Sequence, residues 1–367
     1  MPFFPFLASS GNSHPGSRPR DIALDALRTL AILGMMATHT TRLIPIRARW
    51  EINRLGLLLE PIIPCLFLAL VGASLVLVWE KLRVKEEYSA QKWVGKQCKR
   101  AAGLWLIGVI FYCCENGFVL PDVFAAPGIL GTIAYAIILL ACLLSLPGHV
   151  YAIAACLALG LAAYGYLDHR GLSVFLLNQG NSPVFPILLF ALAGALYARA
   201  GLAVKDRWPR YASFILWLAA TGLLLAMVNR FGLEALFSKP FGRSDAGRVF
   251  TLTENGVTRT ITHGYYNLHP VLSVAVSLAI VSLHQFFSLI SRFIRPVSFG
   301  LLALGRHSLG VYILHLSLLA VAVVTLGKRA FPEAWLGAVV YFGLILICQA
   351  FALWRERSKR WNSSSKA

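Results

Sequence analysis

The first strongly apolar segment of the chain carries side chains that can do acid–base chemistry. Residues 22–42 place Asp25, Arg28 and His39 among leucines, alanines and methionines. Arg28 and His39 share one face of an α-helix and lie about 16 Å apart along its axis. An arginine can bind an anion, a histidine can move a proton near neutral pH, and a carboxylate can hold either of them. At that separation Arg28 and His39 cannot act on the same atoms.

A second apolar segment, residues 298–326, contains the stretch LGRHSLGVYILH. Counted from the start of each segment at about 1.5 Å per residue, Arg306 and His315 lie close to the depths of the arginine and the histidine of the first segment. We therefore expect the two helices to line one polar path, with arginines toward one end and imidazoles toward the other.

Three more side chains belong near these depths. Tyr312 lies one turn before His315 and Ser308 one turn before Tyr312, which places them on one side of the helix. Glu60, near the start of the next apolar segment, is the carboxylate expected at the level of His39, where it can hold the imidazole in one tautomer. Structural alternatives stay open, because arginine and aspartate near helix ends commonly reach lipid headgroups, and a histidine or tyrosine inside a bundle can simply pack.

The composition indicates an all-α, polytopic membrane protein. The chain has 367 residues, 57% hydrophobic and 14% charged, and apolar windows recur along it, each of about the length that crosses 30 Å of hydrocarbon. The transmembrane domain is expected at 22–354, between an N-terminal tail, 1–21, and a basic C-terminal tail, 355–367. About ten transmembrane helices are expected, at 22–42, 56–79, 101–120, 127–146, 149–167, 183–199, 211–229, 268–290, 298–326 and 334–354.

An even number of spans places both termini on one side of the membrane. If that side is the cytoplasm, the inner segments hold 20 Lys and Arg residues and the outer segments hold 12, a bias that favours both termini inside. The net charge of +18 then reflects topology and anionic lipid. In the outer loop, about 230–267, the stretch VFTLTENGVTRTIT alternates apolar and polar residues around Asn255-Gly256, which predicts a β-hairpin.

Four stretches, in this order, resemble a family of membrane enzymes. They are ALDALRTLAILGMMATH, EPIIPCLFLALVGASLVL, PGILGTIAYAIILLACLL and LGRHSLGVYILHLSLL, and they cover most of residues 20–320. Together they resemble the heparan-α-glucosaminide N-acetyltransferase catalytic-domain-like family of bacterial transmembrane acyltransferases, which is related to acyltransferase family three. The chain departs from the family pattern at Thr29, where the family usually has Gly, and at Gly131 and Thr132, where it often has Gln and Arg.

The resemblance implies an acyltransferase that moves an acetyl group from cytosolic acetyl-CoA, or another acyl-CoA, to a glycan or glycolipid at the outer face of the bacterial inner membrane. His39 is then a general base or a nucleophile, two roles that the sequence does not separate. Glu60, Tyr312 and His315 join it in the catalytic centre. The donor-binding residues are Asp25, Arg28, Arg306 and Ser308.

The expected partners are membrane lipids, the acyl-CoA donor and the glycan or glycolipid acceptor, with no metal ion and no nucleic acid, and a homo-oligomer stays open. Two other functional classes fit the same polar path. A transporter or flippase for an anionic solute or lipid would use His39 and His315 as proton-coupled sites. A non-catalytic relative would only bind acyl-CoA. The order of the four motifs favours the enzyme.

Overall fold

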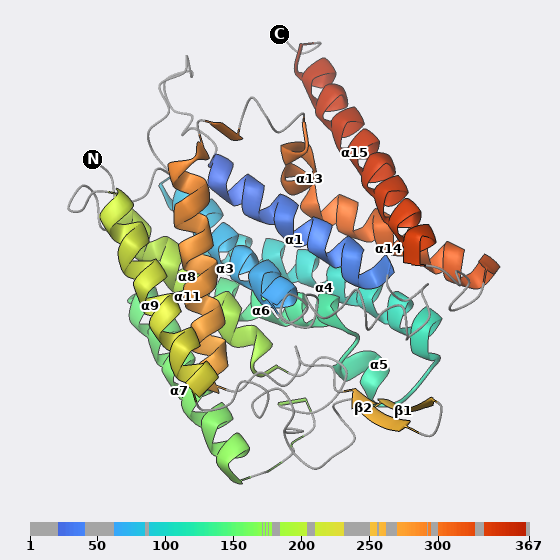
Figure 1. Cartoon of the computed structure of the whole chain (residues 1–367). Coiled ribbons are helices and arrows are strands. Elements are labelled where there is room, and N and C mark those ends of the chain that lie inside the picture. The colour runs from blue at the N-terminus through green and yellow to red at the C-terminus, as the bar shows by residue number, and fades with distance from the viewer. Residues whose placement is uncertain are drawn as a thin grey trace. The chain divides into compact units, whose positions relative to one another are not determined.

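The computed structural model consists of helices and one small hairpin (Figure 1). It describes residues 21–40, 62–84, 88–170, 172, 174, 176–177, 184–203, 210–230, 250–254, 257–261, 270–291, 293–294, 300–326 and 334–364. The elements are α1 (Ile22–Thr40), α3 (Ile62–Arg83), α4 (Ala90–Asn116), α5 (Asp122–Ala125), α6 (Ile129–Ser145), α7 (His149–Arg170), α8 (Ile187–Ala203), α9 (Arg210–Arg230), β1 (Phe250–Glu254), β2 (Val257–Ile261), α11 (Pro270–Leu289), α13 (Leu302–Arg306), α14 (Ser308–Leu326) and α15 (Ala334–Ser364).

Each apolar window of the sequence coincides with helix in the described part of the chain, but some of the expected bounds are corrected. The window at 298–326 is two helices, because α13 and α14 meet at His307 (φ −110°, ψ 26°). His307 N donates to Ala303 O and Val311 N donates to His307 O, both at 3.0 Å, so helical hydrogen bonds continue up to the junction and from it. The junction is therefore a kink. At the other end of the chain, α15 continues as far as Ser364, through most of the segment expected as a tail.

Four helices in the described residues are long and apolar enough to cross a membrane: Ile22–Thr40, Ile62–Arg83, His149–Leu167 and Trp335–Ser358. Shorter apolar helices lie within α6, α8, α9, α11 and α14. Helix length and composition thus support a membrane protein. Ten spans, with both termini inside, remain predictions.

The hairpin expected around Asn255-Gly256 is confirmed. β1 and β2 pair antiparallel, with Phe250 opposite Ile261 and Glu254 opposite Val257. This register leaves two residues to connect the strands, the connection length that favours an Asn-Gly turn. The two connecting residues themselves lie outside the described residues.

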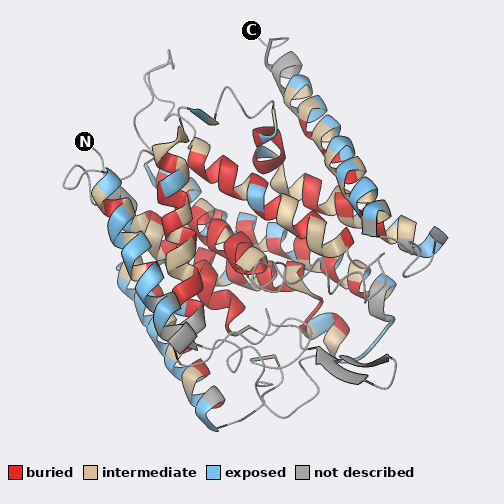
Figure 2. Ribbon diagram, in the orientation of Figure 1, coloured by how far each residue is buried: buried red, intermediate tan, exposed pale blue. Residues whose placement is uncertain are grey.

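The chain divides into two compact units. One contains Pro64–Ser282, and the other contains Pro2–Ile63 together with Leu283–Ala367. In the second unit α1 packs against α13, α14 and α15, so that the first helix and the last three share one core. Figure 2 shows α1 buried over most of its length, whereas α7 and α9 of the other unit have long exposed faces. Those faces carry large apolar side chains such as Leu159 and Leu223, as expected of helices that meet lipid.

Within the first unit, α3 and α8 approach each other through small residues. A Cβ placed on Gly72 would overlap the carbonyl oxygen of Ala191, and a Cβ placed on Gly194 would overlap the carbonyl oxygen of Ala69. No side chain fits at either glycine, so the two backbones are in contact. Close approach through small residues is a common way for membrane helices to associate, since lipid offers no hydrophobic driving force between them.

We expect Gly194→Ala to destabilise the protein, because the added methyl group would push α3 and α8 apart. Overpacking of this kind costs about 1–3 kcal/mol, which the melting temperature of the detergent-solubilised protein measures. Gly165→Ala in α7 is the matched control, since no atom lies within 4 Å of a Cβ there and alanine is favoured over glycine in a helix by about 1 kcal/mol. Equal melting temperatures for the two variants would contradict the close contact.

Candidate functional site

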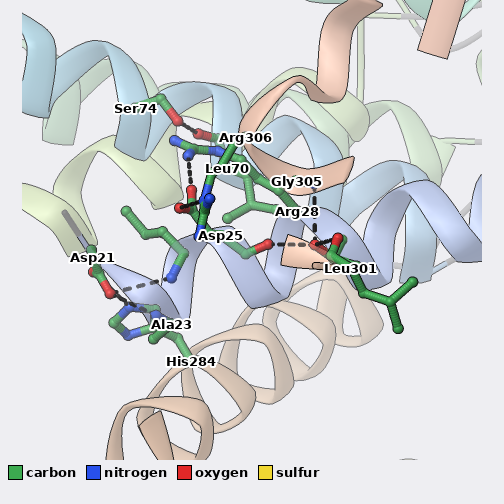
Figure 3. A network of polar contacts seen from close by, with 12 residues as sticks. Asp21, Ala23, Asp25, Arg28, Leu70, Ser74, His284, Leu301, Gly305 and Arg306 are labelled. Carbon is green, nitrogen blue, oxygen red and sulfur yellow. Dashed lines mark hydrogen bonds and ion pairs between the residues drawn. The ribbon is translucent and has the colours of Figure 1, made fainter. Parts of the chain in front are cut away.

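Asp21 caps the beginning of α1. Its Oδ1 accepts hydrogen bonds from Ala23 N at 2.8 Å and from Leu24 N at 3.3 Å, which satisfies N–H groups that the first turn of a helix leaves without partners. Its Oδ2 lies 3.5 Å from Nε2 of His284, whose side chain is buried in α11. One carboxylate thus fixes both the start of α1 and its place beside the end of α11 (Figure 3).

Asp25, one turn further along α1, is a buried carboxylate that faces both arginines of the expected polar path. Its side chain is 4% exposed, and Oδ1 accepts a hydrogen bond from Arg28 Nη1 at 3.0 Å. Arg306 of α13 approaches Oδ2 with its Nε at 3.6 Å (Figure 3). Nη1 of Arg306 also pairs with Glu356 of α15 at 2.7 Å. Two guanidinium groups therefore face two carboxylates, and together these four groups carry no net charge.

Thr29 links α1 to α13 beside this cluster. Its hydroxyl donates to the backbone oxygen of Asp25 at 2.8 Å and accepts a hydrogen bond from Gly305 N at 3.1 Å. A Cβ on Gly305 would overlap that same Asp25 oxygen, so the close approach of the helices requires glycine there. Thr29, one of the three positions noted above as departures, therefore makes an interhelical contact that a glycine could not make.

His39 and His315 form the second polar contact between the two helices. His39 Nδ1 lies 3.0 Å from His315 Nε2, and the rings are stacked, with an interplanar angle of 13°. Nδ1 of His315 lies 3.3 Å from Val311 O, which can only accept. In the uncharged form, His315 therefore carries its hydrogen on Nδ1 and accepts at Nε2. His39 then donates from Nδ1, which leaves its lone pair on Nε2.

Tyr312 packs beside both imidazoles. Its ring centroid lies 5.1 Å from that of His315 and 6.4 Å from that of His39, edge to face in each case. Tyr312 and His315 are buried, whereas His39 is half-buried. Within this group His39 is therefore the most exposed member. Ser308 begins α14 one turn before Tyr312 and is half-buried.

The structure gathers most of the expected site residues at two levels of one unit. The arginines meet at Asp25, and the histidines meet beside Tyr312, as equal depths on two parallel helices allow. Glu60, expected to orient His39, lies outside the described residues. Among the described residues the imidazole that contacts Nδ1 of His39 is His315. No group of three or more His, Cys, Asp or Glu side chains that could hold a metal ion occurs in the part searched.

The sequence interpretation missed Glu356 and the pair of Asp21 with His284. Glu356 lies in the segment expected as a basic tail. It is the one carboxylate in 355–367, among five Lys and Arg residues, and this could have indicated an ion pair. Asp21 immediately precedes the first apolar window, the place where a helix cap is expected. No sequence signal links Asp21 to His284, because the two are brought together only by packing.

A family model described as heparan-alpha-glucosaminide N-acetyltransferase, catalytic, matches residues 20–226. The matched part includes α1, with its aspartate, arginine and histidine, and extends into α9; the matched range ends before α13 and α14. A comparison with curated proteins finds no match.

We expect Asp25→Asn to lower the free energy of unfolding by about 3 kcal/mol, because breaking a buried ion pair costs roughly 3–5 kcal/mol and both arginines here are partly exposed. Unfolding by SDS in mixed micelles measures the change. Glu356→Gln is the control: its ion pair with Arg306 is more exposed, and such pairs contribute below about 1 kcal/mol. Equal losses in the two variants would show that Asp25 is not the centre of the cluster.

Proposed function

Because the chain belongs to the heparan-α-glucosaminide N-acetyltransferase catalytic family, we propose that it moves an acetyl or other acyl group from cytosolic acyl-CoA to a glycan or glycolipid at the outer face of a bacterial inner membrane. The family is one of acetyltransferases, and the apolar helices support a membrane protein. What we propose beyond the family is the acyl-CoA donor, the glycan or glycolipid acceptor, and transfer toward the outer face of the membrane. The observation that carries it is the contact of a half-buried imidazole with a fully buried one.

In this proposal His39 works through Nε2, the nitrogen that the contact with His315 leaves with a lone pair. It accepts the proton of the acceptor hydroxyl or amine as the oxygen or nitrogen attacks the thioester carbonyl. The new acyl bond forms, the carbon–sulfur bond breaks, and the thiolate of CoA takes the proton from the imidazolium. The alternative is attack by Nε2 on the thioester, which breaks the carbon–sulfur bond, expels the thiolate of CoA and gives an acetyl-imidazole. The acceptor then attacks its carbonyl, the carbon–nitrogen bond breaks, and the thiolate takes the acceptor's proton.

His315 is a positioning residue in either route. Its Nε2 holds the Nδ1–H of His39, so the ring keeps the tautomer that leaves the lone pair on the other nitrogen. Tyr312 and Ser308 are proposed to place the donor or to stabilise the oxyanion of the tetrahedral intermediate. Glu60 is proposed as a second group that orients His39.

Arg28 and Arg306 are proposed to hold the phosphates of the donor, with Asp25 keeping both guanidinium groups in place. Their side chains are 22% and 33% exposed, and a guanidinium group suits bidentate binding of a phosphate. The cluster is neutral, so we propose that an incoming phosphate displaces Glu356, the more exposed carboxylate, from Arg306. The distance of about 16 Å along α1 from the arginine level to the histidine level suits a donor that spans both.

A transporter or flippase is the second candidate, and the kink at His307 favours it, because transporter sites are commonly built at interrupted helices. Two facts weigh against it. The hydrogen bonds at His307 follow the helical pattern, and Gly305 and Arg306 of α13 are bound to Thr29 and Asp25. Uptake or lipid translocation by reconstituted protein without acyl-CoA would decide for this second function.

We expect His39→Ala to lower transfer of radiolabelled acetyl groups by about 10³-fold, within the 10²–10⁴-fold that a general base contributes. The assay uses reconstituted protein, acetyl-CoA and an envelope extract of glycans and lipids. Binding of acetyl-CoA serves as the control and should be retained, because the arginine level is untouched. Transfer at the wild-type rate by the variant would remove His39 from the chemistry.

We expect His315→Leu to lower kcat by about 10–100-fold, as when the outer group that orients a metal-bound histidine is removed, with little change in KM for the donor. His315→Gln should retain more activity than His315→Leu, because the amide oxygen of glutamine can accept from His39 Nδ1. Steady-state kinetics of the two variants tests this role. Equal activities would mean that His315 only fills space.

A further inference from the structure

The first part of α4 has two distinct faces. The helix begins at Ala90, whereas the apolar window that predicted it begins at residue 101. Trp93 and Gln97, one turn apart, are buried on one side. The exposed side carries four cations, named here the basic stripe: Lys92, Lys96, Lys99 and Arg100. Residues 90–100 thus extend α4 beyond its apolar segment.

The exposed side of α4 changes character near Gly103. The lysines of the stripe are followed on the same side of the helix by Gly103 and then by Leu106 and Ile110, at helical spacing. Leu106 is 55% exposed and Ile110 is 54% exposed. A single face that is cationic before residue 103 and apolar after it is what a helix presents where it passes from the headgroup region into hydrocarbon. The pattern of this face fits a membrane surface near Gly103, although α4 is not among the helices that length and composition alone identify as spans.

The positive charge of the stripe is not compensated within the described part of the protein. The sequence has no Asp or Glu between Ala90 and Cys114, and no ion pair involves the stripe among the described residues. Glu80, at the end of α3, is buried and is already held at 2.6 Å by Arg83 and by Arg199. A partner with negative charge must therefore come from outside these residues.

Aromatic and cationic groups also meet at the corner between α3 and α4. Trp79 Nε1 donates to the hydroxyl of Tyr88 at 2.9 Å, and the guanidinium of Arg83 lies 4.8 Å from the centre of the Trp79 ring. Tryptophan and tyrosine gather where hydrocarbon meets water, because one end of each ring is apolar and the other is polar. The corner therefore contains the residue types that are enriched at a membrane surface, although Trp79 itself is buried in the protein.

We propose that the basic stripe binds the headgroups of anionic phospholipids in the leaflet beside the α3–α4 corner, with their acyl chains along Leu106 and Ile110. Four cations that no carboxylate of the described residues pairs with match the phosphodiester charge of these lipids. Each cation near an anionic surface strengthens association by a factor of about five. The attraction weakens with salt, since the Debye length is about 8 Å at physiological ionic strength. This interaction goes beyond the proposed transfer reaction and does not depend on it.

The test measures lipid selectivity of the full-length protein in phosphatidylcholine vesicles. Electron spin resonance of trace spin-labelled phosphatidylglycerol and phosphatidylcholine gives the fraction of each lipid held at the protein surface. Lys96→Gln combined with Lys99→Gln is expected to lower the preference for phosphatidylglycerol at least two-fold, as is high salt with the wild type. The charge-conserving Lys96→Arg with Lys99→Arg should keep the preference.

The matched control removes the same charge elsewhere, by Arg355→Gln with Arg357→Gln on the exposed side of α15. An unchanged preference in the Lys→Gln variant, or an equal loss in the α15 control, would overturn the proposal. Binding of CoA to the same samples separates the two sources of phosphate. If the Lys→Gln variant loses CoA binding and keeps its lipid preference, the stripe serves the donor instead, and the lipid proposal fails whatever the acetyl-transfer assay shows.

Discussion

The carboxylate of Asp25 is the constraint on which the rest of the second unit depends. A charged group that is 4% exposed in an apolar bundle must have cations beside it, and the chain supplies them from its own helix and from α13. Thr29 and Gly305 bring the two backbones into contact at the same level. The register of α1 against the later helices is thereby fixed at one end.

That register also sets the contact between the histidines at the other end of α1. α1 and α14 run in the same direction, so fixing Asp25 opposite Arg306 brings His39 opposite His315. A shift by one helical turn, about 5.4 Å, would separate the two rings and end the hydrogen bond that sets the tautomer of His39. The ion cluster and the imidazole pair therefore depend on the same position of α1 along the later helices. Any chemistry at His39 relies on a charge pair roughly four turns away along the helix.

The first unit uses different physics. Its α3 and α8 are held by direct backbone contact at glycines, and its buried charge, Glu80, is balanced by two arginines. Among the described residues, the cations on the exposed side of α4 lie outside the core and have no carboxylate paired with them. A membrane protein can leave charge there because the headgroup region provides water and counterions within a few ångströms of the hydrocarbon.

The sequence by itself determined where the helices lie, the hairpin at Asn255-Gly256, and the level of each polar residue on its own helix, because apolar period, turn chemistry and rise per residue are local properties. Only the tertiary structure decided that Glu356 joins the arginines, that Thr29 binds Gly305, and that His315 contacts His39. The kink at His307 also escaped the apolar pattern, which is continuous across it. These choices depend on how helix faces rotate and pack, and the partners, such as Thr29 and Gly305, are up to 276 positions apart. Spacing within one helix says at what height a side chain stands, but not which side chain of another helix will face it.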